Sequence, residues 1–145
     1  LSFFFPIIIA SGGNSGSQSS VLVIRSLAIG EVRLGHWKRV ILREWGQGAV
    51  LGLILGVLLG LLGLLRTSFG AAAALPVHPA QLGLAVALAL LLVVTLGTTL
   101  GSALPLLFKR LGMDPAIMSA PAIAASMDVV GLFGFFHVVR LILGI

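Results

Sequence analysis

A run of polar residues and glycines lies inside an otherwise apolar segment near the start of the chain. Residues Ser11–Ser20 read SGGNSGSQSS, with Phe3–Ile9 before them and Val21–Ile24 after them. Such residues are costly where they face lipid and acceptable where they face water or another helix. We therefore expect this segment to lie along a water-filled path or against a neighbouring helix.

The composition identifies an integral membrane protein. Hydrophobic residues occupy 59% of the 145 positions, charged residues occupy 9%, and the mean hydropathy is +1.20. A soluble domain carries about 25% charged residues. The length accommodates about four spans of ~20 residues. We predict an all-α fold, a polytopic membrane helical bundle that forms a single transmembrane domain over residues 1–145. The spans are expected at about residues 2–28, 46–65, 82–108 and 115–143.

Basic residues gather between the first two expected spans. Residues 25–45 hold five of the nine Lys and Arg residues, interleaved with apolar residues and both tryptophans. This mixture is typical of an interfacial, partly helical connector at the lipid headgroups, and we interpret its charges as solvated. The turn at 109–113 carries two more basic residues. Both segments are expected on the cytoplasmic side of the cell (inner) membrane. The net charge of +5 comes without a basic face interleaved with aromatic residues, which argues against nucleic acid as a partner.

Four glycines recur at every fourth position of the second expected span. They are Gly48, Gly52, Gly56 and Gly60, and they share one helix face. This repeated small-xxx-small spacing favours close approach of another helix. We therefore predict that this ridge packs against a helix and lines no ion pathway.

Two amides favour a pathway along the first span. Asn14 and Gln18 are four residues apart, and Gly13 and Ser17 share a neighbouring face. Small residues alone are equally consistent with a helix-packing face. Tight packing needs small side chains but not amides, whose oxygens can bind the waters of a hydrated ion.

The fourth span carries an acid at depth. Asp114 and Pro115 form a strong helix start, a capping acid followed by proline at the first helical position. Asp128 lies ~21 Å further along that helix, near the middle of a hydrocarbon core ~30 Å thick. Its face also carries Pro121, Ala124, Ala125 and Gly131. An intramembrane acid among small residues is typical of a pore wall, and the alternative is a hydrogen bond or salt bridge inside the bundle.

Three motifs resemble the membrane domain of the MgtE family of magnesium channels. They are Gly12–Ser19 leading to Ile24–Ala28, then Leu104–Ala116, and then Asp128–Leu132. The resemblance covers nearly the whole chain. It implies that the four helices correspond to the second through fifth of the family's five. The chain starts at Leu1, inside an apolar run, and we interpret it as a fragment. The first helix and the cytoplasmic regulatory regions with their CBS domains are then expected outside it.

The same resemblance implies a homodimer with a pore on its two-fold axis. The second and fifth family helices line that pore, so Asp128 matches the pore aspartate and Ala124 a position that offers its backbone carbonyl. Gly12–Asn14 match a polar break in the pore helix. The predicted metal ligands are thus Asp128 and Ala124, and the predicted pore-lining residues are Gly12, Gly13, Asn14, Ser17, Gln18, Pro121, Ala125 and Gly131. The chain has Ala124–Ser126 where the family usually has threonines, which leaves the ion preference among divalent cations open.

The expected function is a magnesium channel or transporter in a lipid bilayer. Mg²⁺ dehydrates reluctantly and is bound through few carboxylates and retained waters. The sequence has no Walker motif, no nucleophile with a base and no His or Cys cluster, and we expect no enzyme. One alternative is a proton- or sodium-coupled carrier, with Asp128 as a relay and Gly12–Gly13 as the break of a discontinuous helix. The other alternative is a non-transporting membrane scaffold.

Overall fold

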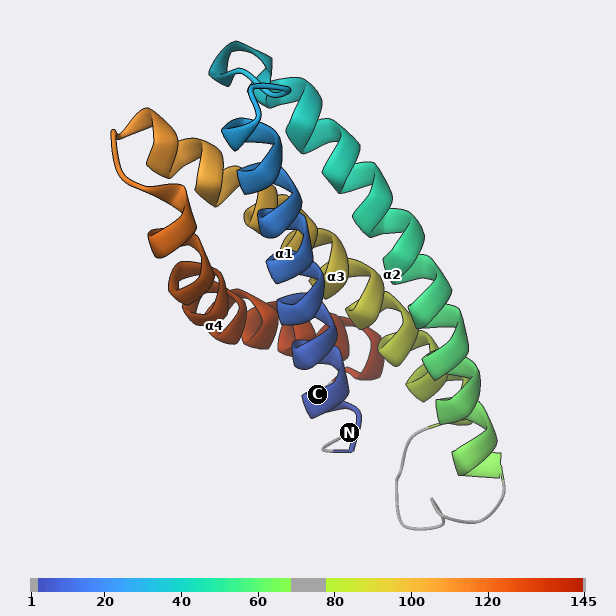
Figure 1. Cartoon of the computed structure of the whole chain (residues 1–145). Coiled ribbons are helices and arrows are strands. Elements are labelled where there is room, and N and C mark those ends of the chain that lie inside the picture. The colour runs from blue at the N-terminus through green and yellow to red at the C-terminus, as the bar shows by residue number, and fades with distance from the viewer. Residues whose placement is uncertain (1–2, 69–77, 145) are drawn as a thin grey trace.

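The regular structure of the described chain is helical. The computed structural model describes residues 3–68 and 78–144, which form α1 (Phe5–Ala28), the short 3₁₀ helix η1 (Leu34–His36), α2 (Trp37–Ser68), α3 (Pro79–Arg110) and α4 (Pro115–Leu143) (Figure 1). This confirms the predicted all-α bundle. Ser2, at the start of the first expected span, lies outside the described residues.

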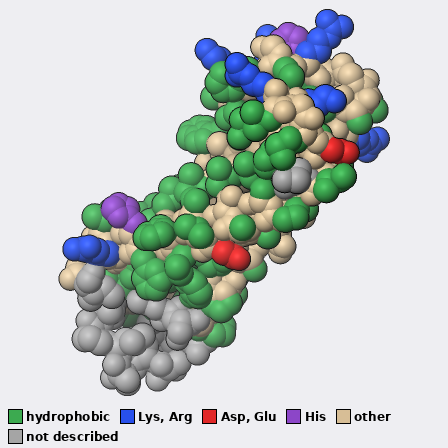
Figure 2. Space-filling view, turned by 90° about the vertical axis from the view of Figure 1, so that its left-hand side faces the viewer, with side chains coloured by type: hydrophobic (Ala, Val, Ile, Leu, Met, Phe, Trp, Pro, Cys, Tyr) green, Lys and Arg blue, Asp and Glu red, His purple; other side chains and the backbone are tan. Residues whose placement is uncertain are grey.

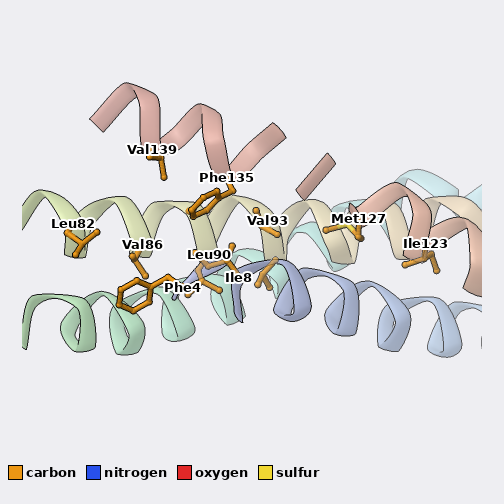
Figure 3. Close-up of a cluster of buried hydrophobic side chains, with 12 residues drawn as sticks. Phe4, Ile8, Leu82, Val86, Leu90, Val93, Ile123, Met127, Phe135 and Val139 are labelled. Carbon is orange, nitrogen blue, oxygen red and sulfur yellow. The ribbon is translucent and has the colours of Figure 1, made fainter. Parts of the chain in front are cut away.

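α3 is the central helix, and α1, α2 and α4 all contact it. Side chains from α1, α3 and α4 meet in one buried cluster (Figure 3). Ile8 of α1, Leu90 and Val93 of α3, and Met127 of α4 are all at most 1% exposed. Because lipid is as apolar as these side chains, van der Waals packing holds such a bundle together.

The glycine ridge of α2 packs along α3, as the spacing predicted. Gly48 lies against Thr95 and Thr98, Gly52 against Leu91, Gly56 against Ala87, and Gly60 against Gly83. A Cβ atom added at Gly56 would lie only 2.6 Å from the carbonyl oxygen of Ala87. The two helix backbones therefore approach each other at a distance that only glycine allows at these positions.

Side chains at the helix ends fix where two helices begin. The Asp114 carboxylate accepts a hydrogen bond from the Ala116 amide at 2.8 Å, which confirms this residue as the cap of α4. His78 is exposed and its Nδ1 accepts from the Ala80 amide at 3.3 Å. His78 therefore caps α3. Between α3 and α4, Gly112 has φ +76°, a conformation that favours glycine.

The connector is shorter than the sequence predicted. α1 continues to Ala28 and α2 begins at Trp37, so Lys38, Arg39 and Arg43 lie on the first turns of α2. The helix that contains the expected span from Gly46 thus begins nine residues earlier, at Trp37, because hydropathy marks where apolar residues begin and not where the backbone becomes helical. Likewise α3 extends beyond both ends of its expected range, whereas α4 matches its own.

Three of the described helical segments are long and apolar enough to cross a membrane: Leu34–Leu65, Pro79–Arg110 and Ser119–Leu143. α1 is not among them, because the polar residues of Ser11–Ser20 lower its hydropathy. The prediction of four membrane-spanning helices is thus supported for three. Hydrophobic side chains cover much of the middle of the molecule, and Lys and Arg side chains gather towards one end (Figure 2).

Candidate functional site

α1 is a continuous helix through the whole polar run. The segment from Phe5 to Ala28 is helical without interruption, although Pro6 lies in its first turn. The break that the family resemblance implied at Gly12–Asn14 is therefore absent from this structure. One side of the run is buried in the bundle, at Ser15, Ser19 and Ser20. Only part of the polar run is thus available to line a pathway.

α1 and α4 pack together in an antiparallel register. Gly12 lies against Met127 of α4, Gly16 against Ile123, and Gly131 of α4 against Ile9. These contacts place Asp128 level with Gly12 and Gly13. Ala124 is one turn away, level with Gly16. The first and last helices of the chain are therefore neighbours, as a shared pathway requires.

Most of the predicted pathway residues have exposed side chains in the single chain. They are Asn14, Ser17 and Gln18 on α1 and Pro121, Ala124, Ala125 and Asp128 on α4.

The contacts of α1 show on which side of the helix Gly13 lies. Gly12 touches both Val93 of α3 and Met127 of α4. One residue further on, the helix has turned by about 100°. Gly13 therefore lies past the α4 contact, towards the outside of the bundle. A Cβ atom on Gly13 would meet nothing within 4 Å.

The corresponding turn on α4 leads to the same side. Gly134 lies against Leu92 of α3, and Gly131 lies against Ile9 of α1. Continuing round α4 from the α3 contact past the α1 contact brings Ala124 and then Asp128 to the surface. Asp128 and Gly13 thus border the same outer side of the α1–α4 contact, and the exposed Ser17, Asn14 and Gln18 lie further round α1. We call this the α1–α4 surface.

Two predicted pore-lining glycines lie inside the bundle instead. Gly12 is buried, and a Cβ atom there would lie 2.6 Å from Val93 Cγ1 and 2.7 Å from Met127 Cε. Gly131 is also buried, and its added Cβ atom would lie 3.0 Å from Ile9 Cδ1. Glycine at these two positions allows α1, α3 and α4 to approach closely. In this arrangement Gly12 and Gly131 contribute to a pathway only indirectly, by positioning the helices.

The exposed residues of α1 and α4 offer a small set of oxygen ligands. They are the carboxylate of Asp128 on α4, and the amide oxygens of Asn14 and Gln18 and the hydroxyl of Ser17 on α1. No group of three or more His, Cys, Asp or Glu residues is close enough to hold a metal ion among the described residues. One chain therefore offers a single carboxylate, which suits a hydrated hard cation better than a fully coordinated soft metal.

The sequence reasoning missed a buried acid on α2. Glu44 is 6% exposed, and its Oε2 accepts a hydrogen bond from the Ser19 hydroxyl at 2.5 Å. Ser19 Oγ also lies 3.1 Å from the carbonyl oxygen of Thr98, so this contact joins α1, α2 and α3. The signal was present, because Glu44 lies four residues before Gly48 and thus continues the glycine ridge that faces the bundle.

These features define a class of protein: a polytopic membrane helical bundle with a carboxylate exposed on α4 and two amides exposed on the neighbouring α1. The sequence model of the MgtE family, described as divalent cation transporters, matches residues 5–138. The chain therefore belongs to the MgtE family.

Curated relatives extend the comparison. The chain is 41% identical to "Magnesium transporter MgtE" of Thermus thermophilus over 99% of its own length and 29% of that protein. It is 31% identical to "Magnesium transporter MgtE" of Bacillus subtilis, over 95% of its own length and 28% of that protein. The chain thus spans less than a third of the length of these relatives.

Proposed function

We propose that this chain forms part of the membrane domain of a Mg²⁺ transporter, with an ion pathway along the α1–α4 surface. Asp128 is the observation that carries the proposal. It is exposed in the middle of an apolar helix that packs against α1, on which two amides and a hydroxyl are also exposed. A carboxylate is costly against lipid. Water, an ion or another protein surface is therefore expected to cover it.

The ligand chemistry of the surface supports Mg²⁺ as the transported ion. Mg²⁺ usually keeps several waters and binds protein through one or two carboxylates. In this proposal Asp128 binds the hydrated ion, and the Ala124 carbonyl adds an oxygen one helical turn away. Asn14 and Gln18 accept hydrogen bonds from the waters of the ion. The relatives named as magnesium transporters support the same ion.

The proposal includes a homodimer. One chain supplies one carboxylate at this surface, and a two-fold axis facing it would bring two Asp128 side chains and two polar faces of α1 around one pathway. Two facing acids give the few carboxylates that a hydrated Mg²⁺ uses. In this proposal the basic end of the molecule lies on the cytoplasmic side of the cell membrane, where positive charge is favoured. A regulatory region would lie in the part of the protein that this chain does not cover.

A proton- or sodium-coupled carrier is the second candidate, and it rests on the same acid. In that case Asp128 would titrate or bind Na⁺ during the transport cycle. The continuous backbone of α1 provides no discontinuous helix for such a carrier. The channel-like pathway is therefore the function that the geometry supports best.

Magnesium flux through the full-length protein in liposomes tests the proposal. Asp128→Asn keeps the shape of the side chain and removes its charge, and we expect flux to fall about tenfold or more, equivalent to at least about 1.4 kcal/mol in the barrier. Asp128→Ala should be at least as impaired. Glu31→Gln is the matched control, because Glu31 is an exposed acid near η1, away from the α1–α4 surface.

The outcomes separate the candidates. Normal flux through Asp128→Asn would end the account of a hydrated ion held by this carboxylate. Parent flux that disappears when an imposed proton or sodium gradient is collapsed would favour the coupled carrier. Absence of flux in the parent protein, with all variants alike, would favour the scaffold.

A further inference from the structure

An apolar groove separates α2 from α3 at the basic end of the molecule. It has a volume of about 670 Å³, and its lining includes Leu34, Trp37, Ile41, Leu104, Leu107 and Arg110. These residues come from η1, the first turns of α2 and the last turns of α3. The groove lies apart from the α1–α4 surface, and none of its lining residues belongs to the proposed ion pathway.

The groove exists because the glycine ridge ends. From Gly60 to Gly48, α2 presents glycine to α3 at every fourth position, and the backbones stay close. Beyond Gly48 the α2 side chains next to α3 are bulky, at Ile41 and Trp37. The two helices diverge towards this end (Figure 1). The space between them is lined by hydrocarbon and is open to the outside of the bundle.

Positive charge borders the groove at one end. Arg110 is exposed in the last turn of α3 and contributes to the lining. Trp37 is 44% exposed, and Lys38 Nζ lies 5.6 Å from the centre of its ring. No acid is among the residues that line the groove. Lys and Arg side chains gather at this end of the molecule (Figure 2).

We propose that this groove binds one anionic phospholipid, with an acyl chain between α2 and α3 and the phosphate beside Arg110 and Lys38. An apolar groove with basic residues at its membrane-interface end matches the two parts of such a lipid. The tryptophan at the border is the residue type that prefers the same depth, between hydrocarbon and headgroups. A zwitterionic lipid fits the apolar lining equally well but gains less from the basic border. The groove therefore discriminates between lipids by headgroup charge.

Quenching of Trp37 fluorescence by brominated lipids tests the proposal. The full-length protein is reconstituted into phosphatidylcholine vesicles with increasing fractions of brominated phosphatidylglycerol or brominated phosphatidylcholine. Subtracting the signal of Trp37→Phe isolates the quenching at Trp37. We expect half-maximal quenching at about fivefold lower mole fraction of the brominated anionic lipid, the ratio that about 1 kcal/mol for one basic residue gives.

Three variants assign the preference to the groove. Arg110→Gln should bring the two quenching curves closer together, because only Lys38 then remains beside the phosphate, whereas Arg110→Lys should keep most of the preference. Arg25→Gln is the matched control, because Arg25 is an exposed base near the same end that does not line the groove. Arg110 is exposed, so its variants should fold as the parent does, which circular dichroism checks.

Several results would overturn the proposal. Identical curves for the two lipids in the parent protein would show that headgroup charge is not recognised. Equal loss of preference in Arg25→Gln and Arg110→Gln would assign the effect to diffuse surface charge. Absence of Trp37 quenching by either lipid would show that a protein segment or a second copy covers the groove.

Discussion

Two acids in apolar helices meet opposite environments in this chain. Asp128 is exposed on α4, and what satisfies its carboxylate must come from outside the single chain. Glu44 is buried on α2, and the Ser19 hydroxyl donates a hydrogen bond to it. Asp128 is therefore expected to matter for function with little effect on folding, whereas Glu44 and Ser19 are expected to matter for the stability of the bundle.

We predict that Ser19→Ala destabilises the bundle by about 2 kcal/mol. The variant leaves the Glu44 carboxylate buried without the hydroxyl that donates to it, and hydrogen bonds to charged groups contribute about 1.5–3 kcal/mol. Denaturant titration of the protein in detergent micelles measures the change. Ser15→Ala is the control, since Ser15 is also buried on α1 but makes no side-chain hydrogen bond within the described residues. Equal destabilisation by both variants would contradict a specific role for the Ser19–Glu44 bond.

We predict that Asp128→Asn leaves the free energy of unfolding within about 0.5 kcal/mol of the parent value. Asp128 is exposed, and substitutions at such positions away from structural contacts usually have effects of that size. The same denaturant titration measures the change. Strong destabilisation would mean that Asp128 has a structural partner, and loss of flux in this variant would then no longer report on ion binding.

At the scale of the helices, glycine determines how closely the elements pack. Gly12 and Gly16 of α1 face Gly97 and Gly101 of α3, where backbone lies directly against backbone. The same holds along the α2 ridge. α1 and α2 thus approach α3 closely at these glycines, without large side chains between the backbones, which is how membrane helices gain packing energy.

We predict opposite effects for two glycine-to-alanine changes on α2. Gly56→Ala should destabilise the bundle by about 1–3 kcal/mol, because its Cβ atom would lie 2.6 Å from the Ala87 carbonyl oxygen and overpacking forces the helices apart. Gly46→Ala meets nothing within 4 Å and should stabilise α2 by about 0.5–1 kcal/mol, since alanine is the better helix former. Thermal unfolding in micelles compares the two. Similar melting temperatures for both variants would contradict the close α2–α3 contact.

The sequence predicted the helices and one of their contacts from strong periodic signals. The glycine ridge and the Asp114–Pro115 start are local patterns with direct physical causes, and both are confirmed. The sequence predicted a partly helical connector before the second span but not the residue at which α2 starts, because Trp37–Arg43 is equally compatible with an interfacial connector and with a charged helix end.

For the candidate site, the sequence predicted which helices meet but not which residues of each helix face inward. Gly12 and Gly131 were grouped with the pathway because they are small and close to Asn14 and Asp128 in sequence. The structure uses them for helix contacts, since small residues serve both purposes. Only the position of α3 decides between the two roles, and α3 is distant in sequence from both. The proposed roles of the exposed residues remain predictions.

At the scale of the whole molecule, the outer surfaces of the bundle differ in chemistry. α2 exposes apolar side chains along most of its length, including Val50, Ile54 and Leu58, as expected of a surface against lipid. α1 and α4 expose two amides, a hydroxyl and a carboxylate. A single copy in a bilayer would leave these polar groups against lipid. In the proposed dimer, a second copy would cover the α1–α4 surface, remove that cost and enclose the proposed pathway.

The dimer can be tested by cross-linking at one exposed position on α4. The described chain has no cysteine. Ala125→Cys places a thiol on the α1–α4 surface, and in the proposed dimer the two thiols face each other across the axis. A short bifunctional thiol reagent in proteoliposomes at low protein density should therefore convert most of this variant to a covalent dimer on a denaturing gel. Leu58→Cys, in which the replaced side chain is 60% exposed on α2, is the control and should stay monomeric.

The same cross-linking can be measured with and without Mg²⁺. Mg²⁺ between the copies would draw the two Asp128 carboxylates together, so cross-linking of Ala125→Cys should change with Mg²⁺. That dependence should disappear in the double variant Ala125→Cys/Asp128→Asn. Cross-linking through Leu58→Cys alone would place the interface on α2 and leave the α1–α4 surface without its partner.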